Sequence, residues 1–237
     1  MNRSIQIVFL VLSIGFFVSA AQADEWQYTF APYLYGAGMD GRVGIAGREV
    51  EAEASFSDVL SNLEFGFMAH FEAANEKWII ISDLGYVGLG VATTVPAADL
   101  DVNQWVVEGG VGRRINENFE VLFGGRYFRL DEEIRFKGPL GINVQGDQNW
   151  FDPFIGARGK IHFSENAALM LRGDIGGFGV GSDFAWTITP SFLYSINEKY
   201  SLAFFYKVQS VDREDDDNGF VFDVISSGPG FGMAMHF

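Results

Sequence analysis

The three histidines, His70, His162 and His236, are the side chains of this sequence best suited to acid–base or metal chemistry. None stands in a zinc-binding spacing such as His-Glu-x-x-His. Ser164 follows His162, but it falls in a predicted polar turn, whereas a nucleophilic serine needs a base held within hydrogen-bond reach. His70 is the strongest single candidate, and a lone histidine in a hydrophobic stretch usually belongs to a packed polar network. We therefore expect no catalytic, cofactor-binding or metal site.

Acidic residues form three clusters, at Asp99 and Asp101, at 131–133 and at 212–217. Paired carboxylates could serve acid–base work or hold a divalent cation. The segment "EDDDNG", which begins at Glu214, matches the first half of a calcium loop. The match fails at the twelfth position, where Ile225 replaces the glutamate that a calcium loop requires. These clusters are therefore interpreted as solvated acidic turns.

A second set of charges lies singly inside hydrophobic stretches, on the less apolar face of each. We predict that they line an interior and pair there, since an unpaired buried charge costs several kcal/mol. If "INEN" (115–118) is a hairpin turn, Arg114 faces Glu120 and Glu108 faces Arg126, which is favourable across two strands. The predicted interior network consists of Glu64, Asp83, Glu108, Arg126, Arg158, Arg172, Asp174 and Lys207.

The elements that carry these charges have a period of two. In 63–72, Leu63, Phe65 and Phe67 alternate with polar or small residues, which is the pattern of a β-strand. Four short segments that place Asn beside Glu, "ANEK", "INEN", "SENA" and "INEK", predict tight turns on one side. Longer connections at 38–62, 89–100, 132–147 and 213–218 fall on the other side. The strands are expected near 26–37, 63–75, 77–88, 101–114, 118–131, 148–163, 166–179, 183–196, 199–212 and 219–237.

The N-terminus and the composition restrict where such strands can lie. Residues 1–23 read as a secretory signal peptide, with Arg3, an apolar run and a small-residue cleavage site at 21–23. Residues 24–237 then form one domain. It has no cysteine for disulfides, and the net charge of −15 of the full chain argues against nucleic acid as a partner. No later apolar run is long enough for a membrane helix, so a membrane-spanning chain must cross as strands.

Together these features predict an all-β fold, an antiparallel up-and-down transmembrane β-barrel of ten strands, with eight or twelve as the alternatives. The count becomes twelve if 41–55 joins the sheet. Tryptophans near strand ends are typical of an aromatic girdle at the membrane surfaces, and they are Trp26, Trp78, Trp105, Trp150 and Trp186. A secreted soluble β-sandwich or ligand carrier is the competing fold, because alternation alone does not separate the two.

The signal peptide, the strand repeat and the last strand, which ends in Phe237, resemble Gram-negative outer-membrane β-barrel proteins, especially the OmpA-like and OmpW-like groups. "APYLYGAGMDGRVGI" and "SFSDVLSNLEFGFM" also resemble a widespread set of uncharacterised bacterial outer-membrane proteins. The resemblance covers essentially all of 24–237. It implies location in the outer membrane, contact with its lipid, and recognition of the Phe237 strand by the barrel-assembly machinery. It implies no activity.

The expected function is a structural or narrow-pore role, without enzymatic activity and with a charged, largely filled lumen. A ten-stranded barrel is near the size whose interior side chains can fill. The alternative is an outer-membrane lipid-modifying enzyme or hydrolase that uses His70 or the acidic clusters.

Overall fold

The computed structural model describes residues 26–45, 47–51, 53, 55, 57–58, 63–94, 97–136, 143–215 and 219–237. The predicted signal peptide and part of the predicted calcium-like turn lie outside these residues. Almost all of the described chain is β-strand. No helix in these ranges is long and apolar enough to cross a membrane.

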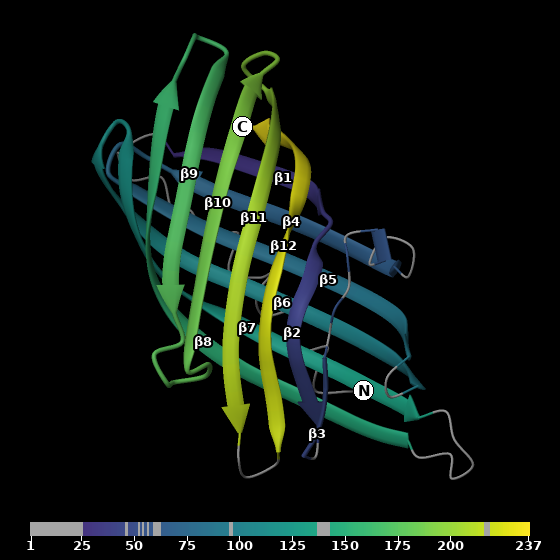
Figure 1. The fold of residues 1–237 in the computed structure, drawn as a ribbon. Coiled ribbons are helices and arrows are strands. Elements are labelled where there is room, and N and C mark those ends of the chain that lie inside the picture. Colours follow the sequence, from purple (N-terminus) through teal and green to yellow (C-terminus); the bar gives the residue numbers. More distant parts are fainter. Residues whose placement is uncertain are drawn as a thin grey trace, which may run out of the picture.

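Ten antiparallel strands close into a ring, because β1 pairs with β12 as well as with β4 (Figure 1). The predicted ten-stranded up-and-down barrel is therefore confirmed, and two packed sheets are excluded. The ring strands are β1 (Gln27–Tyr35), β4 (Leu63–Ala74), β5 (Trp78–Thr94), β6 (Ala97–Asn116), β7 (Phe119–Phe136), β8 (Asn143–His162), β9 (Ala167–Gly176), β10 (Phe184–Ser195), β11 (Tyr200–Asp215) and β12 (Phe220–His236).

The alternative in which 41–55 joins the sheet is realised by a hairpin that begins at Gly38. It consists of β2 (Gly38–Ile45) and β3 (Arg48–Glu51), and β2 pairs with β12 from Gly38↔Ser227 to Gly44↔Val221. β1 and β2 therefore lie end to end along β12, and the whole sheet has twelve strands. β3 folds back on the free edge of β2.

The Asn/Glu turns lie at one end of the barrel, together with the start of β1 and the end of β12 (Figure 1). Their asparagines act as side-chain acceptors. Oδ1 of Asn75 accepts from the backbone N–H groups of Lys77 and Trp78, and Asn197 does the same for Lys199 and Tyr200. None of the described asparagines has a positive φ. Asn is thus selected here for capping the turn, as in other Asx turns.

The outer surface of the ring is apolar. Large hydrophobic side chains are exposed on successive strands, as expected for a band that faces lipid, and examples are Phe123, Ile155, Leu171, Ile188, Phe204 and Phe231. On β7 this band ends after Tyr127, since the next outward residues, Arg129 and Asp131, form an exposed ion pair of 3.1 Å. Residues of β7 beyond Arg129 therefore lie outside the apolar band.

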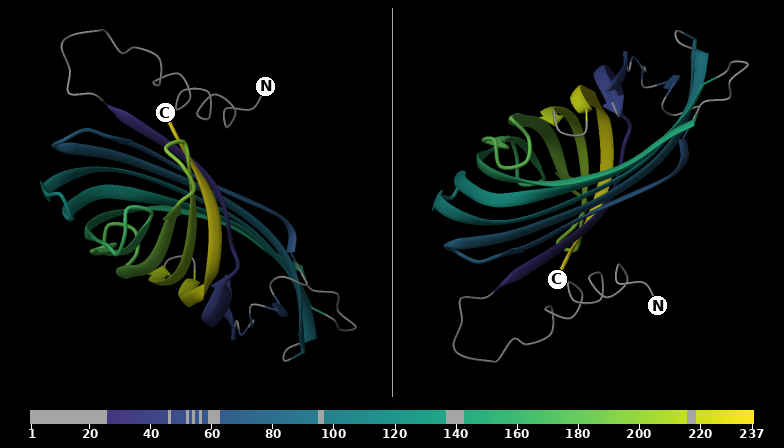
Figure 2. Two further views of the ribbon diagram at one scale, coloured as in Figure 1. Left: turned by 90° about the horizontal axis from the view of Figure 1, so that it is seen from above. Right: turned by 90° about the horizontal axis from the view of Figure 1, so that it is seen from below.

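Two of the predicted long loops are mostly strand. β5 continues to Thr94, and β6 already begins at Ala97. In the same way, β7 continues to Phe136, and β8 begins at Asn143. The sequence analysis assigned 89–100 and 132–147 to connections between strands, and the structure extends the strands into them. Figure 2 shows β5 to β8 reaching beyond the rest of the barrel on one side.

The prediction that Trp150 belongs to the aromatic girdle is wrong. Its side chain is only 5% exposed and points inward, where it stacks on Phe128 with ring centroids 4.9 Å apart. It shares its face of β8 with Asp152, which also points inward, whereas Phe151 is exposed outside. Trp150 belongs to a buried core that fills the outer part of the lumen and that the sequence did not reveal, formed by Val43, Phe128, Leu130, Trp150, Ala185, Val211, Phe220, Phe222 and Val224.

Candidate functional site

Four of the predicted charges meet in the lumen and form what we term the central ion-pair cluster, Glu108, Arg126, Arg172 and Asp174. Arg126 Nη2 lies 2.6 Å from Glu108 Oε2 and 3.1 Å from Asp174 Oδ1. Arg172 Nη2 lies 2.5 Å from Glu108 Oε1 and 3.3 Å from Asp174 Oδ2. Two cations therefore share two carboxylates, and the cluster is neutral within the interior.

A second group, the cross-lumen chain, runs from β1 to β8. Arg158 Nη1 lies 2.6 Å from Glu72 and its Nε lies 2.5 Å from Glu120. His70 lies 3.7 Å from Glu72 through Nε2 and 3.0 Å from Asp83 through Nδ1. The Tyr33 hydroxyl donates to the other oxygen of Asp83 at 2.5 Å. The chain thus links Tyr33, Asp83, His70, Glu72, Arg158 and Glu120.

These contacts cross the barrel, since they join strands that are not neighbours. Glu72 on β4 and Arg158 on β8 are separated by β5, β6 and β7 in the ring, and Glu108 on β6 reaches Arg172 on β9 past two strands. Interior charges on a wide barrel would instead face water. The side chains of the two clusters therefore occupy the lumen at this level.

The strand register explains why the charges arrive together. Glu108 lies opposite Arg126, and Arg114 lies opposite Glu120, as the "INEN" hairpin predicted. Arg158 and Arg172 also lie directly opposite each other on β8 and β9. Like charges in this position repel, and the four carboxylates around the two guanidinium groups offset that repulsion.

The remaining predicted network residues are placed differently. Asp83 belongs to the cross-lumen chain, whereas Lys207 on β11 lies apart from both clusters. Glu64 falls within β4, but its side chain lies outside the described part of the structure. Glu72 and Tyr33 were missed by the sequence reading. His70 faces inward on β4, and residues two apart on a strand share a face. The same alternation could therefore have identified Glu72, two residues further on.

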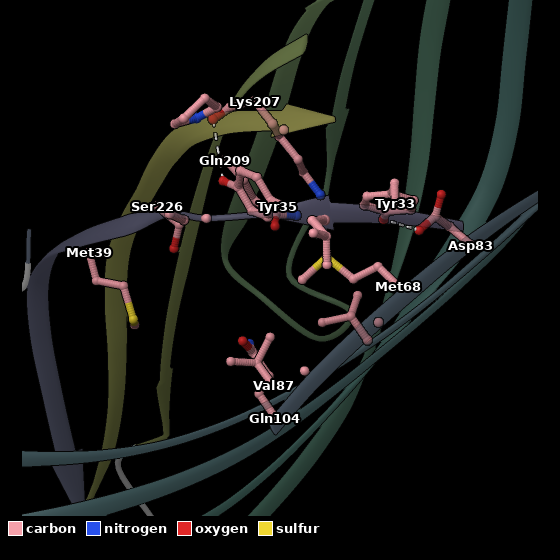
Figure 3. Close-up of a pocket in the computed structure, with 18 of the residues that line it drawn as sticks. Tyr33, Tyr35, Met39, Met68, Asp83, Val87, Gln104, Lys207, Gln209 and Ser226 are labelled. Carbon is pink, nitrogen blue, oxygen red and sulfur yellow. Dashed lines mark hydrogen bonds between the residues drawn. The ribbon is translucent and has the colours of Figure 1, made fainter. Parts of the chain in front are cut away.

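A cavity of about 560 Å³, termed the lateral cavity, lies beside the clusters (Figure 3). Tyr33, Tyr35 and Lys207 border it on one side, and Val87 and Gln104 face them from β5 and β6 across the space. The lumen was predicted to be largely filled. Within the described residues it contains both a packed charged layer and a cavity.

The residues that the sequence offered as catalytic candidates, His70 and Ser164, make contacts that stabilise the fold. Both ring nitrogens of His70 face carboxylates. The Ser164 hydroxyl accepts from the N–H groups of Asn166 and Ala167 and so caps its turn. Among the described residues, no group of three or more His, Asp or Glu side chains could hold a metal ion.

Glu132 is a buried carboxyl at the outer end of β7, beyond the apolar band. It is 5% exposed, and within the described part of the chain neither of its side-chain oxygens has a hydrogen-bond partner. Burial removes water from the carboxylate, which raises the pKa of Glu132 from 4.5 to about 8. Ionisation of this group in the folded barrel is therefore unfavourable.

Glu132→Gln is expected to stabilise the barrel at alkaline pH. The unfolded carboxyl ionises near pH 4.5, so the wild type loses stability as pH rises from there to about 8, with about 1.4 kcal/mol per pKa unit as the scale. Urea unfolding between pH 4.5 and 9 measures this difference, which should vanish near pH 4.5. Glu133→Gln is the control, since Glu133 pairs with Arg135 at 3.3 Å. An equal gain at every pH would contradict the assignment.

No protein-family model and no curated protein matches the sequence. Solved structures of similar fold include the outer-membrane protease OmpT from Escherichia coli, 11% identical, with a TM-score of 0.49 and coverage of 93% of this chain and 99% of OmpT. Ail, the attachment invasion locus protein of Yersinia pestis, is 13% identical, with a TM-score of 0.44 and coverage of 91% and 100%. With TM-scores below 0.5, these likenesses carry no argument about this chain, and the assignment of the closed barrel rests on its own strand pairing.

Proposed function

We propose that this chain is an integral protein of the Gram-negative outer membrane whose own side chains close its lumen, with a structural or narrow-pore role and no enzymatic activity. The observation that carries the proposal is the set of ion pairs that cross the barrel, from Glu72 to Arg158 and from Glu108 to Arg172. An open channel needs a water-filled path, and buried, mutually paired side chains block one.

The location in the outer membrane is supported by the closed barrel and its apolar outer surface. Residues 1–23 would act as the signal peptide that delivers the chain. Phe237 is exposed on the outer face at the end of β12, and its backbone N–H donates to Tyr28 O at 2.9 Å across the closing seam. This position suits a strand end that the barrel-assembly machinery reads before the ring closes.

Uptake of a monosaccharide by liposomes tests the closed lumen. Liposomes with the wild-type barrel should swell no faster than protein-free liposomes. The double variant Glu108→Ala/Arg126→Ala removes the pair without leaving one of its charges alone, and it should speed up swelling because it empties the centre of the cluster. Arg129→Ala/Asp131→Ala removes an exposed pair of the same kind and should behave as the wild type. Rapid swelling with the wild type would contradict the proposal.

The absence of enzymatic activity is tested at His70. Its two carboxylate neighbours support a role in holding the cross-lumen chain together. His70→Ala should therefore leave the lipid profile of the outer membrane unchanged, whereas an altered acyl or head-group composition would favour a lipid-modifying enzyme.

A further inference from the structure

We propose that the lateral cavity binds a single-chain amphiphile with an anionic head group, which enters from the surrounding lipid through a seam between β1 and β4. The head group would pair with Lys207, and the apolar chain would occupy the cavity and leave through the seam. This binding requires only that the barrel lie in a membrane, and it is independent of whether the lumen conducts.

The seam is a break in the strand pairing of the ring. β1 and β4 pair from Gln27↔Ala74 only as far as Tyr33↔Met68. β4 continues for five further residues, to Leu63, with β5 as its only described partner. On the other side, β2 begins at Gly38 and follows β12, so within the described residues no strand pairs with this edge of β4.

The cavity reaches the outer surface of the barrel at this seam. Its lining includes Leu34, which is 71% exposed, and Phe67 and Phe231, which also belong to the outward faces of their strands. The same cavity is lined by inward residues such as Met68 and Val106. Because Leu34 on β1 and Phe67 on β4 border the same space as these inward residues, the geometry points to an opening between the lumen and the lipid-facing surface at the seam.

The walls suit an apolar chain. Most lining side chains are hydrophobic, and the inward ones include Met39, Met68, Val87, Val106, Phe128 and Val224. The volume of about 560 Å³ lies within the range of roughly 300–1,000 Å³ that small-molecule sites occupy. A space of this size favours one acyl chain over a diacyl lipid.

Lys207 supplies a cation that lacks an acidic partner. Its ammonium lies 5.6 Å from the centre of the Tyr35 ring, and none of the ion pairs found among the described residues includes it. Arg126, Arg158 and Arg172 each contact a carboxylate. Figure 3 shows the Lys207 side chain extending between Tyr35 and Tyr33 into the cavity.

Asp83 also borders the cavity, but its oxygens are occupied. One accepts from the Tyr33 hydroxyl and the other faces His70 Nδ1. The group available to a ligand is therefore the cation, and an amphiphile with an anionic head would satisfy it. A buried charge without a partner is costly, so the site should prefer a ligand whose head group is negatively charged.

Two substitutions separate the head-group site from the cavity. Lys207→Met removes the charge and retains an apolar side chain. Gly85→Leu fills the cavity, because a Cβ at Gly85 meets only Met68 Cγ at 3.7 Å and Val106 O at 4.0 Å. Gly109→Leu is the matched control, since a Cβ at this exposed glycine of β6 meets no atom within 4 Å.

Equilibrium binding of radiolabelled palmitate and of hexadecanol to purified protein in non-ionic detergent provides the test, with heat-modifiable gel mobility as the check of folding. Palmitate should bind saturably and more tightly than hexadecanol. Lys207→Met should weaken palmitate binding about tenfold or more and leave hexadecanol binding unchanged. Gly85→Leu should abolish both, and Gly109→Leu should change neither.

Four results would overturn the proposal. The first is the absence of saturable palmitate binding to the folded wild type. The second is that the wild type binds palmitate and hexadecanol equally tightly and that Lys207→Met does the same. The anionic head group would then have no part in binding. The third is unchanged binding in folded Gly85→Leu, which would place the ligand elsewhere. Competition by an anionic diacyl lipid as strong as by unlabelled palmitate would overturn the single-chain assignment.

Discussion

Arg126→Ala is expected to lower the free energy of unfolding of the barrel by about 3–5 kcal/mol, the usual cost of breaking a buried ion pair from one side. Arg126 is 2% exposed and contacts both Glu108 and Asp174. Its removal leaves Arg172 as the only described cation in the cluster, against two carboxylates. Urea unfolding in lipid vesicles, read by heat-modifiable mobility, measures the loss.

Two further variants separate unpaired charge from lost packing. Arg126→Met combined with Glu108→Gln should recover most of the stability, because neutral groups of similar volume often replace a buried pair at little cost. Arg129→Ala should change the stability by about 1 kcal/mol or less, since its ion pair with Asp131 is exposed. A loss in Arg126→Ala as small as in Arg129→Ala would mean that the central cluster is hydrated.

Trp150→Ala is expected to destabilise the barrel by about 3–5 kcal/mol, the range for removing a buried large aromatic side chain. The ring of Trp150 stacks on Phe128 and lies 6.0 and 5.8 Å from the rings of Phe220 and Phe222. The guanidinium of Arg213 lies 5.3 Å from the same ring. Truncation would therefore leave a cavity between β7, β8 and β12, and urea unfolding in lipid vesicles measures its cost.

Phe123→Ala is the control for the aromatic core. Phe123 lies on the outward face of β7 and is 54% exposed, so lipid can replace its contacts. Its loss should cost much less than that of Trp150. Equal effects of the two substitutions would place Trp150 in the girdle, as the sequence first suggested, and not in the lumen.

The sequence predicted the ring of strands well, because the period of two and the Asn/Glu turns are local signals. It also predicted the register of the 97–136 hairpin, in which Glu108 meets Arg126. The position of Trp150 was derivable too. Asp152 is a charge inside a hydrophobic stretch, of the kind predicted to line the interior. Residues two apart on a strand share a face, so Trp150 was expected to point inward with it.

The contacts across the barrel could not be predicted from the sequence. Which charges meet depends on the tilt of the strands and the closure of the ring, and neither is a local property. Arg158 therefore found Glu72 on β4, 86 positions away in the chain, and Lys207 remained outside the network with which it was grouped. The seam arises for the same reason, since β2 pairs with β12 and, among the residues that the structure describes, no strand pairs with the outer part of β4 on one side.

The closed lumen is tested most directly by recording from wild-type protein in a planar lipid bilayer. Folded barrels, identified by their heat-modifiable mobility, should show no steady open state and at most brief, small current steps, because the ion pairs of Glu72 with Arg158 and of Glu108 with Arg172 cross the lumen. A stable open conductance of the size that wide porins show would contradict this account.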